Sequence, residues 1–552
     1  MTYNFSCNCR YLEGSPQATA GLAVWVVLAK SSRHHFASNF PGNETTITQI
    51  SPRSVARLTA TVDSNSTGQL RDPDQRQRGT SLKIWESLVK TIDSGAMRSL
   101  SCCLLWLVGG VRLNSAAEVP TFLLAAELAA GDTTTVKVTL EVGGEMLVNE
   151  ETGTKKLPLT VAGELQYTEQ LLAWSADPAH VARSLREYQT ATAKIQVDDG
   201  GILRSLPDSQ RLVVAEIRDG RAALGGNGSS LTRDQFDLIN VIGNSLALNR
   251  LLPERELADG ESWEHESASI GALLGMDHVA ACAVRSVVAG NTHRQVQIRL
   301  AGTVHGTIDG APTEVQLRGA YLFHQQRKQI TKFNLAIKEL RTASEIVPGL
   351  DVVAKISVSV SPANESLAGK FNESARDVSH ALAESLRYDA PQQGYRFLHD
   401  RRWYVTAEQS DLVSLRCLQD GSLTAHCNVT TLPARSEGRG SSLQDFERDV
   451  RQTLGDNLET VTASTEWTTA EGHECLGVVA QGQIKGVAIE WRYYLVASPD
   501  LPRISVAVTM KQSMVEQFND ADRQLVDSLE LREKPATGTA AKPSLGELLP
   551  RK

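Results

Sequence analysis

The sequence predicts an α+β protein: a large, curved antiparallel β-sheet domain with one or two packed helices, then a smaller domain. Three observations predict it. Between residues 121 and 362, stretches such as "TTTVKVTLEV" alternate apolar and polar residues, as half-buried antiparallel strands do. Only two helical stretches interrupt these strands. After residue 395 the order becomes strands, helix, strands and helix, which is typical of an antiparallel sheet covered by helices.

A secretion signal is predicted at residues 97–117, well inside the chain. Arg98 supplies the positive charge, residues 100–111 the apolar run, and Ser115-Ala116-Ala117 the small residues before a cleavage site. The apolar run has about 12 residues, whereas a membrane-spanning helix needs about 20. We therefore expect cleavage after Ala117. The alternative is a short buried core helix.

Residues 1–96 are expected to be disordered or a mis-assigned upstream extension, the alternative being a long export leader. Their polar segments show neither helical nor strand periodicity and cannot bury enough surface to fold. The whole chain has a net charge of −8, but residues 1–117 carry +5 and residues 118–552 carry −13. The charge thus changes sign at the predicted cleavage site.

The composition of the mature chain limits its partners and its location. An acidic chain without a basic cluster argues against nucleic-acid binding. No second apolar run approaches membrane-spanning length, so no transmembrane helix is expected in the mature chain. We expect an exported protein, periplasmic or extracellular, and association with the envelope is left open. Its length suggests two or three domains.

The first predicted domain covers residues 118–362. Asp219-Gly220 is expected at the tip of a hairpin. Thr232 and Gln235 have the spacing of a capping box, which begins a helix that ends before Pro253. A second, short helix is expected over residues 267–276.

A polar linker is predicted at 363–394, the second domain at 395–531 and a disordered tail at 532–552. In the second domain, Ser442 and Asp445 are expected to cap one helix, and Ser513 and Glu516 the last helix.

Four cysteines follow the predicted cleavage site: Cys282, Cys417, Cys427 and Cys475. In an oxidising compartment, four cysteines allow three complete disulfide patterns. A hairpin centred on residues 420–421 would set Cys417 opposite Thr424, so a direct bridge between Cys417 and Cys427 is not expected. Cys475 is the preferred partner of one of them. The alternative is that all of them are reduced and buried.

Two resemblances can be named from these residues. Residues 394–531, with the entry "GYRFLHDRRWYV" and an amphipathic closing helix, resemble the PsbP/Mog1 family, which implies an α/β/α sandwich. The segment "LLPERELADGESWEH", residues 251–265, resembles a "P…V…GDSW" element of uncharacterised secreted bacterial proteins with a β-rich N-terminal domain. Both resemblances imply non-enzymatic accessory or assembly proteins, and neither carries over a catalytic residue.

Two histidine motifs are candidates for chemistry. His473 and Cys475 share one face of a strand, but a zinc site needs about four ligands and no second pair is near in sequence. His265 lies between Glu264 and Glu266, which could orient a general base. A turn into a helix capped by Ser267 explains the same residues.

Two further motifs have structural interpretations. The glycine-rich residues 225–230 lack the dinucleotide fingerprint and the phosphate-loop lysine, which favours a loop before a helix cap. The aromatic residues 490–494 alternate along a strand, which favours sheet core. We predict no catalytic residue, no metal and no cofactor.

Three functions remain open. The first is a secreted non-catalytic binding or scaffolding protein of the bacterial cell envelope, which recognises a protein or a surface polymer. The second is a carrier with an apolar cavity between the curved sheet and the helix at 232–250, suited to a lipid. The third is a hydrolase in which a histidine, a carboxylate and a nucleophile converge from distant positions.

Overall fold

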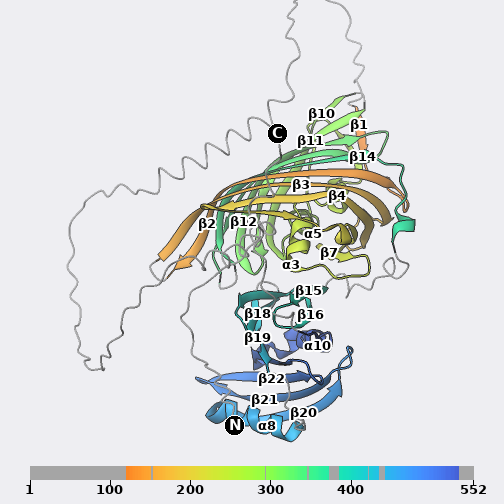
Figure 1. The fold of residues 1–552 in the computed structure, drawn as a ribbon. Helices are drawn as coiled ribbons and strands as arrows, with labels where there is room; N and C mark the ends of the chain where they lie inside the picture. Colours follow the sequence, from red (N-terminus) through yellow and green to blue (C-terminus); the bar gives the residue numbers. More distant parts are fainter. Residues whose placement is uncertain are drawn as a thin grey trace, which may run out of the picture.

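The computed structural model describes residues 120–533, apart from 151–152, 293, 345–346, 372–384, 420–421 and 434–441. The predicted signal at 97–117, the extension at 1–96 and nearly all of the tail at 532–552 lie outside the described residues. Of the described residues, 61% are in strands and 15% in helices. The protein is therefore mostly β, and the predicted α+β class is wrong (Figure 1).

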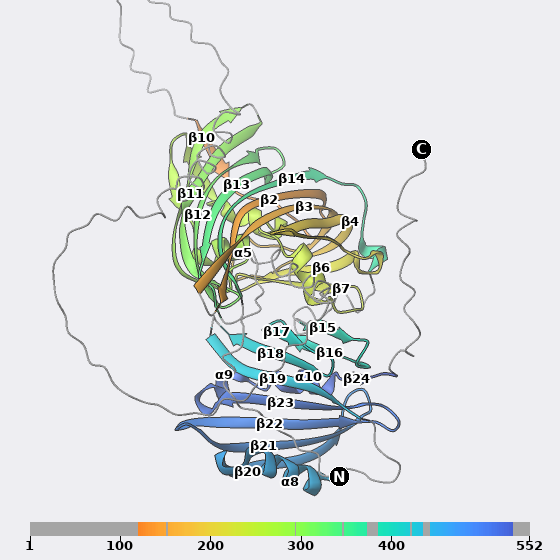
Figure 2. The same ribbon diagram turned by 60° about the vertical axis from the view of Figure 1, so that its left-hand side comes forward.

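The N-terminal unit is built on a 12-stranded antiparallel sheet in the order β7-β6-β4-β3-β2-β14-β13-β12-β11-β10-β9, with β5 paired to β4. A separate pair joins β1 to β8. Figures 1 and 2 show the large sheet curving around short helices. The strands are β1 (Thr121–Leu124), β2 (Thr133–Glu150), β3 (Gly153–Ala173), β4 (Ala182–Val197), β5 (Gly200–Ser205), β6 (Leu212–Arg218), β7 (Arg221–Gly226), β8 (Arg255–Ala258), β9 (Ser262–Glu264), β10 (His278–Thr292), β11 (Gln295–Ile308), β12 (Ala311–His324), β13 (Gln329–Arg341) and β14 (Gly349–Pro362).

The helices of this unit lie inside the curve of the sheet (Figure 2). Besides the single turns η2 (Asp208–Gln210) and η4 (Ala368–Lys370), they are α3 (Arg233–Ile239), α4 (Ser245–Leu248), η3 (Asn249–Leu251) and α5 (Ser267–Leu274). Phe236, Leu246 and Leu251 are buried in one hydrophobic cluster with the inward-facing strand residues. Burial of this apolar area is the main stabilising contribution to the unit.

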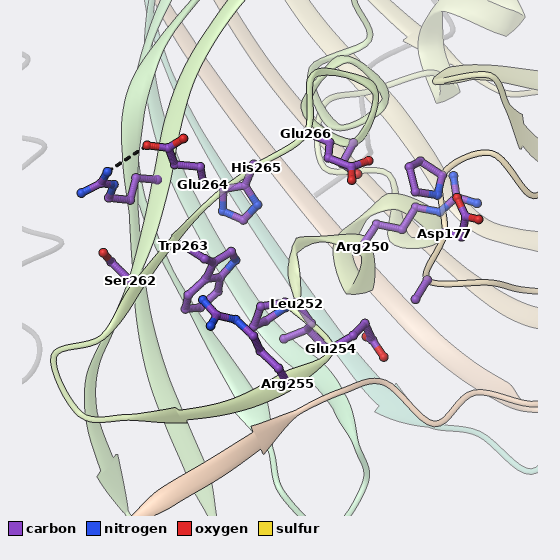
Figure 3. A pocket seen from close by; sticks show the side chains of 15 residues that line it. Asp177, Arg250, Leu252, Glu254, Arg255, Ser262, Trp263, Glu264, His265 and Glu266 are labelled. Carbon is purple, nitrogen blue, oxygen red and sulfur yellow. Dashed lines mark hydrogen bonds and ion pairs between the residues drawn. The ribbon is translucent and has the colours of Figure 1, made fainter.

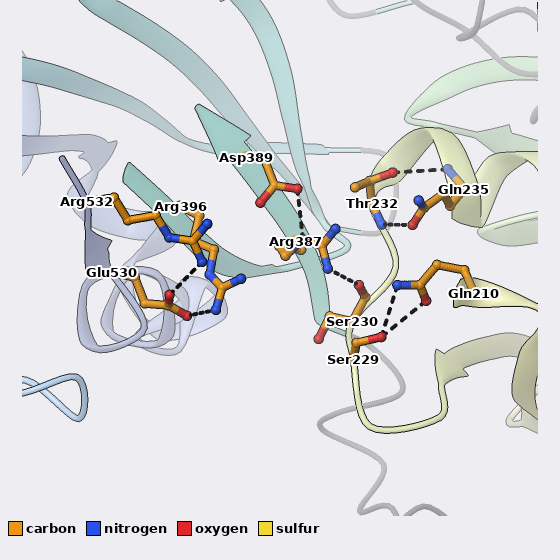
Figure 4. A network of polar contacts seen from close by, with 10 residues as sticks. All are labelled: Gln210, Ser229, Ser230, Thr232, Gln235, Arg387, Asp389, Arg396, Glu530 and Arg532. Carbon is orange, nitrogen blue, oxygen red and sulfur yellow. Dashed lines mark hydrogen bonds and ion pairs between the residues drawn. The ribbon is translucent and has the colours of Figure 1, made fainter. Parts of the chain in front are cut away.

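The capping box of Thr232 and Gln235 is confirmed, but the single helix predicted to run on to Pro253 is interrupted (Figure 4). Gly243 has a φ of +87°, and a Cβ there would lie 3.0 Å from the side chain of Val358 on β14. Asn244 then accepts a hydrogen bond from the amide of Leu246 and begins α4. Close packing against the sheet therefore divides this helix.

The predicted hairpin at Asp219-Gly220 is confirmed. The two residues have φ values of 50° and 74°, and Arg218 pairs with Arg221 on the neighbouring strand. Positive φ at both central positions is the geometry of the tight turn that joins twisted antiparallel strands.

The C-terminal unit contains a seven-stranded antiparallel sheet, β17-β18-β19-β23-β22-β21-β20, and a three-stranded sheet, β15-β16-β24. The predicted α/β/α sandwich is wrong, because the few helices are short and the strands dominate. The elements are β15 (Ser385–Ala390), β16 (Tyr395–Asp400), β17 (Trp403–Glu408), β18 (Leu412–Gln419), β19 (Ser422–Leu432), α8 (Leu443–Leu454), η5 (Gly455–Asn457), β20 (Leu458–Thr468), β21 (Glu474–Ile484), β22 (Val487–Ala497), β23 (Arg503–Lys511), η6 (Gln512–Met514), α9 (Val515–Phe518), α10 (Ala521–Asp527) and β24 (Glu530–Leu531).

Of the two helices predicted for this unit, one begins as expected and the other is interrupted. Ser442 accepts a hydrogen bond from the amide of Asp445 and caps α8, as predicted. The last helix is interrupted instead: Asn519 and Asp520 both have positive φ and separate α9 from α10. The expected cap at Ser513 is absent, because this residue lies in η6 and α9 begins without a side-chain cap.

The two units share a hydrophobic core at their junction. Leu386 of β15 and Leu418 of β18 belong to the cluster of the N-terminal unit. The amide of Arg387 donates to Leu231 O at 2.8 Å, and its guanidinium donates to Ser230 O at 3.2 Å (Figure 4). Strand β15, which makes these contacts, lies within the stretch predicted as a linker.

Candidate functional site

An open pocket of about 810 Å³ lies where β9, α5 and η3 meet the loop after β3 (Figure 3). Strand β9 has only three residues, which pair with β10, and the chain then turns directly into α5. This short connection brings the segment predicted as "WEHES" to the pocket wall. The lining residues are Ala176, Asp177, Pro178, Arg250, Leu252, Pro253, Glu254, Arg255, Ser262, Trp263, Glu264, His265, Glu266, Ser269 and Arg285.

His265 is held by a chain of hydrogen bonds that runs into the core. Its Nε2 lies 2.7 Å from Ser286 Oγ on β10, and Tyr321 OH on β12 donates to the same Oγ at 3.0 Å. A serine hydroxyl has one proton and two acceptor sites, so Ser286 can be either the donor or the acceptor toward Nε2 while it accepts from the tyrosine. Burial lowers the pKa of His265 to about 4. The ring is therefore neutral near pH 7 and is joined to the core through Nε2.

The serine–histidine pair does not have the geometry of a hydrolase nucleophile and base. Ser286 is 0% exposed and is not among the pocket residues, so a substrate has no access to its hydroxyl. The carboxylates that flank His265 in sequence do not orient it either: Glu264 Oε1 accepts from Arg285 at 2.8 Å. Within the part of the chain that the structure describes, the side chain of His265 is bonded to a buried hydroxyl rather than to an accessible nucleophile.

Arg250 forms another wall of the pocket and is 5% exposed. Its Nε donates to Ser175 O at 3.2 Å and its Nη2 to His180 O at 2.6 Å. Its Nη1 is buried and has no hydrogen-bond partner among the described residues. Burial lowers the pKa of Arg250, which Asp177 partly offsets. The guanidinium is thus anchored by two carbonyls and interacts with the Asp177 carboxylate, while its Nη1 is enclosed by the protein.

The beginning of α5 also faces this pocket. The predicted cap, Ser267, is instead the first residue of the helix, and Glu266 occupies the cap position without making a side-chain cap. Ser269, the third residue of α5, lines the pocket. The first amides of a helix point outward and carry partial positive charge.

The remaining charges of the pocket are mixed. Glu264 pairs with Arg285, and Asp177 Oδ2 lies 3.0 Å from His180 Nδ1. Burial raises the pKa of Glu254, whose carboxylate accepts from the amide of Ala126. Glu266 is exposed on the rim above Arg250 (Figure 3). The pocket therefore offers both hydrogen-bond donors and acceptors.

The space that a lipid carrier would need is filled by side chains. Phe236, Ile239 and Leu248, from the helices inside the curve, are all at most 5% exposed and pack in one cluster with the strand residues. This packing argues against the carrier hypothesis.

The residues of the other predicted motifs are hydrogen-bonded or packed within the fold. His473 Nε2 accepts from the amide of Leu531 at 3.2 Å, while Cys475 is buried in the core. Among the described residues, no group of three or more histidine, cysteine or acidic side chains is arranged to hold a metal. In the glycine-rich loop, Gln210 donates to Ser229 at 3.0 Å (Figure 4). Trp491 is 2% exposed and packs in a hydrophobic cluster.

The four cysteines that the structure describes are free thiols. Cys417 pairs with Ala425 rather than with Thr424, because a register shift follows Cys417. Burial raises the pKa of the Cys417 thiol to about 11, and it also raises the pKa of Cys427 and Cys475. Such buried, protonated thiols are poor nucleophiles. A disulfide among Cys417, Cys427 and Cys475 stays a prediction.

None of the helices among the described residues is long and apolar enough to cross a membrane. The predicted cleavage after Ala117 lies outside these residues.

Sequence reasoning missed two features of the site. Arg250 was treated only as the end of a helix, because nothing in the sequence shows that its neighbours would be two carbonyls. Ser286 and Tyr321 reach His265 from strands 21 and 56 residues away in the chain, so no local motif joins them. Alternation along the strand at 278–292 was the one available signal, since it predicts Ser286 on the buried face with Val284 and Val288.

No protein-family profile matches the chain, and no curated protein gives a significant match. Among solved structures, the chain is similar to a PsbP protein (CyanoP) of Synechocystis, with 12% identity and a TM-score of 0.22, over 28% of this chain and 95% of that one. It is also similar to a Bacteroides thetaiotaomicron protein, with 9% identity and a TM-score of 0.20, over 27% of this chain and only half of that one.

A third similar structure is the immunity protein TplEi of Pseudomonas aeruginosa in complex with a peptide. Its identity is 10% and its TM-score 0.18, over 46% of this chain and 99% of that one. Scores of this size carry no argument about function, which must be built from the pocket itself.

Proposed function

We propose that the protein is a non-catalytic binding protein of the bacterial cell envelope, exported by the signal at residues 97–117. It uses the pocket beside His265, which the N-terminal unit forms, to bind its ligand. An envelope protein or surface polymer is the partner class that the sequence suggests. The likeness of residues 251–265 and 394–531 to non-enzymatic accessory proteins supports the same proposal.

The observation that carries this proposal is the enclosed pair of Ser286 and His265. A hydrolase needs its nucleophile beside the substrate, whereas this serine is fully buried and bonded on both sides. The neutral histidine can donate a hydrogen bond without taking part in proton transfer near pH 7, since its pKa is lowered to about 4. Donors fixed around an open pocket are suited to binding.

Hydrolysis of p-nitrophenyl acetate by the full chain and by Ser286→Ala tests the non-catalytic part. Because Ser286 cannot reach a substrate, we expect the same low background rate for both proteins. Ser262→Ala, which removes a hydroxyl at the pocket wall, is the matched control. A rate that falls by an order of magnitude or more only in Ser286→Ala would show that the protein is a hydrolase.

Mass spectrometry of the natural protein tests the export part. We expect a mature N-terminus near Glu118 and recovery of the protein in the periplasmic or extracellular fraction. A natural N-terminus near Met1 would contradict export by this signal.

A further inference from the structure

We propose that the outer face of the large sheet binds a linear polysaccharide that carries carboxylates, as a polyuronate does. The contact surface is a basic face on strands β11–β14, made by Arg299, Arg318, Lys332, Lys338 and Lys355. The inference rests on the proposed binding function for its partner class, a polymer of the cell envelope. It places that polymer on a surface other than the pocket.

The side chains of the basic face point away from the core. Each of the five residues has a neighbour along its strand, such as Leu317 beside Arg318, that is buried in the hydrophobic cluster with the helices. Because side chains alternate along a strand, the five cations lie on the opposite face of the sheet. The helices lie inside the curve of the sheet, so this face is convex (Figures 1 and 2). Three of the cations are exposed and two are half-buried.

No carboxylate interrupts the basic face. Alternate residues in 297–303, 316–322, 332–338 and 353–359 give four outward positions on each strand, of which five carry a cation and none an acid. None of these cations forms an ion pair with a described residue. On this face the surrounding acids, Glu141, Glu314 and Asp351, lie at the margins. Since residues 118–552 carry a net charge of −13, a face without acids is suited to a negatively charged partner.

The strand register spreads the cations across the sheet. Arg318 lies opposite Ala301 on β11 and Ala336 on β13, and Lys355 lies opposite Ala336 from the other side. Neighbouring strands are about 4.8 Å apart, so the Cα atoms of Arg318 and Lys355 are about 10 Å apart. Ala336 is 0% exposed but belongs to none of the hydrophobic clusters, so outer side chains cover it. The long stems of basic residues can cover such a position while their charges stay in water.

This spacing favours a polymer with separate charges. Double-stranded DNA carries one charge per about 1.7 Å, which is much denser than the cations of this face. Sites for single-stranded nucleic acid stack bases on aromatic side chains, and no aromatic residue occupies the outward positions. A flat membrane could touch only part of a convex face, whereas a flexible chain can follow its curve. A linear polymer is therefore the partner that fits best.

The residues between the cations suit the hydroxyl groups of a sugar. Thr303, Asn334 and Ser357 occupy outward positions, and Asn334 lies directly opposite Ser357. Amide and hydroxyl groups can both donate and accept hydrogen bonds. Carboxylates match the fork of a guanidinium, as at Arg299 and Arg318. A polyuronate offers a carboxylate and free hydroxyls on each sugar, whereas polyphosphate has no hydroxyls along its chain.

Biolayer interferometry of the full chain tests the inference. The immobilised probes are polygalacturonate and its fully methyl-esterified form, which has the same backbone without the charges. We expect the acid form to bind at least about 10-fold more tightly than the ester at low salt. Raising the salt from about 50 mM to about 0.5 M should weaken binding of the acid form by about 10-fold or more, because exposed charges are screened.

A triple variant, Arg299→Gln with Arg318→Gln and Lys332→Gln, tests the basic face itself. We expect it to bind polygalacturonate about 10-fold or more weakly than the parent, because three of the five cations are gone. The three residues are exposed, so their replacement should leave the fold intact, which thermal unfolding checks. If the triple variant does not fold, Arg318→Gln alone decides, with an expected loss of about 2- to 5-fold.

The matched control is a triple variant with the same change in net charge elsewhere on the surface. Lys155→Gln, Arg448→Gln and Lys511→Gln replace exposed cations on β3, α8 and β23. This variant should bind polygalacturonate within about 2-fold of the parent. An equal loss in both triple variants would overturn the inference, because binding would then follow net charge alone.

Other results would also overturn it. They are no binding of polygalacturonate, equal binding of the two probes, or a folded variant of the basic face that binds as tightly as the parent. Tighter binding to phosphatidylglycerol vesicles, to polyphosphate or to duplex DNA would assign the face to another partner. A dimer in sedimentation that only the basic-face variant breaks would assign it to a second copy of the chain.

Failure of this inference is distinguishable from failure of the proposed function. Lack of polyuronate binding leaves export and the non-catalytic pocket standing, because the natural N-terminus and the Ser286→Ala rate test those. A natural N-terminus near Met1, or hydrolysis that depends on Ser286, overturns the proposed function whatever the basic face binds.

Discussion

Buried arginine side chains lie both at the junction between the two units and at the pocket. The groups that surround these side chains differ between the two places. At the junction, Arg341 is 2% exposed, and its Nη2 lies 2.5 Å from Glu339 Oε1. At the pocket, Arg250 is 5% exposed, and it donates hydrogen bonds to two carbonyls while the Asp177 carboxylate raises its pKa. A buried charge that is paired at close range contributes to stability mainly through its partner, whereas Arg250 is held chiefly by hydrogen bonds to the backbone.

The junction illustrates the first case in detail. Tyr404 of the C-terminal unit donates to Asp309 Oδ1 at 2.9 Å, and its ring lies 4.5 Å from the guanidinium of Arg233. Arg233 Nη1 is also 3.9 Å from Asp237 Oδ1. Burial raises the pKa of both Asp237 and Asp309, and the nearby arginines oppose this shift. Charges of both signs therefore meet inside the protein.

The largest effect is expected from Arg341→Met, which leaves Glu339 buried without its partner. We expect a loss of about 3–5 kcal/mol in the free energy of unfolding, measured by urea denaturation. The double variant Arg341→Met with Glu339→Leu should recover much of the loss, because no unpaired charge remains. A single variant as stable as the parent would mean that the junction charges do not stabilise the fold.

Ser286→Ala removes the central hydroxyl of the chain that runs from Tyr321 to His265. It leaves buried polar groups without a partner, so we expect a loss of about 1–3 kcal/mol by the same measurement. Ser262→Ala at the pocket wall is the control and should cost less than about 0.5 kcal/mol. Equal losses in the two variants would contradict the description of His265 as held from the core.

Asp277→Asn should stabilise the protein at neutral pH. The pKa of Asp277 is raised to about 6, first by burial and then by Asp309. The folded state thus favours the protonated form, so the stability contributed by this group is full at low pH and falls as the pH rises from about 4 to about 6. We expect Asp277→Asn to gain about 1 kcal/mol at pH 7.5 and almost nothing at pH 4, as followed by thermal unfolding. A gain that does not depend on pH would exclude this titration.

The smallest effect is expected at the pocket rim. Glu264 and Arg285 form an ion pair with side chains that are 77% and 61% exposed. Solvent screens such a pair, so Glu264→Gln should change the free energy of unfolding by less than about 0.5 kcal/mol. A larger change would mean that this exposed ion pair stabilises the fold as the buried charges at the junction do. That result would contradict the difference drawn between the two regions.

Local signals in the sequence predicted local structure well. The capping pairs Thr232 with Gln235 and Ser442 with Asp445 begin helices as expected, because every atom they need lies within one turn. The interruption at Gly243 was not predictable, since its cause is a strand more than a hundred residues away. The class prediction failed for a similar reason: stretches with helical periodicity became several short helices against long strands.

The candidate site was predicted in part. His265 was singled out by its acidic neighbours in sequence, but its bonded partner is Ser286, which antiparallel pairing brings from β10. The surroundings of Arg250, two carbonyls and the Asp177 carboxylate, depend on tertiary contacts that no spacing rule contains. Sequence patterns thus found the segment, and only the assembled sheet showed which residues hold its side chains.

The placement of Leu386 and Leu418 within the first unit's core has a practical consequence. Cutting the chain at the predicted linker would expose apolar surface on both fragments. Each fragment would then be prone to aggregate. Laboratories that want this molecule for crystals or for pull-down assays should therefore express both halves as one piece.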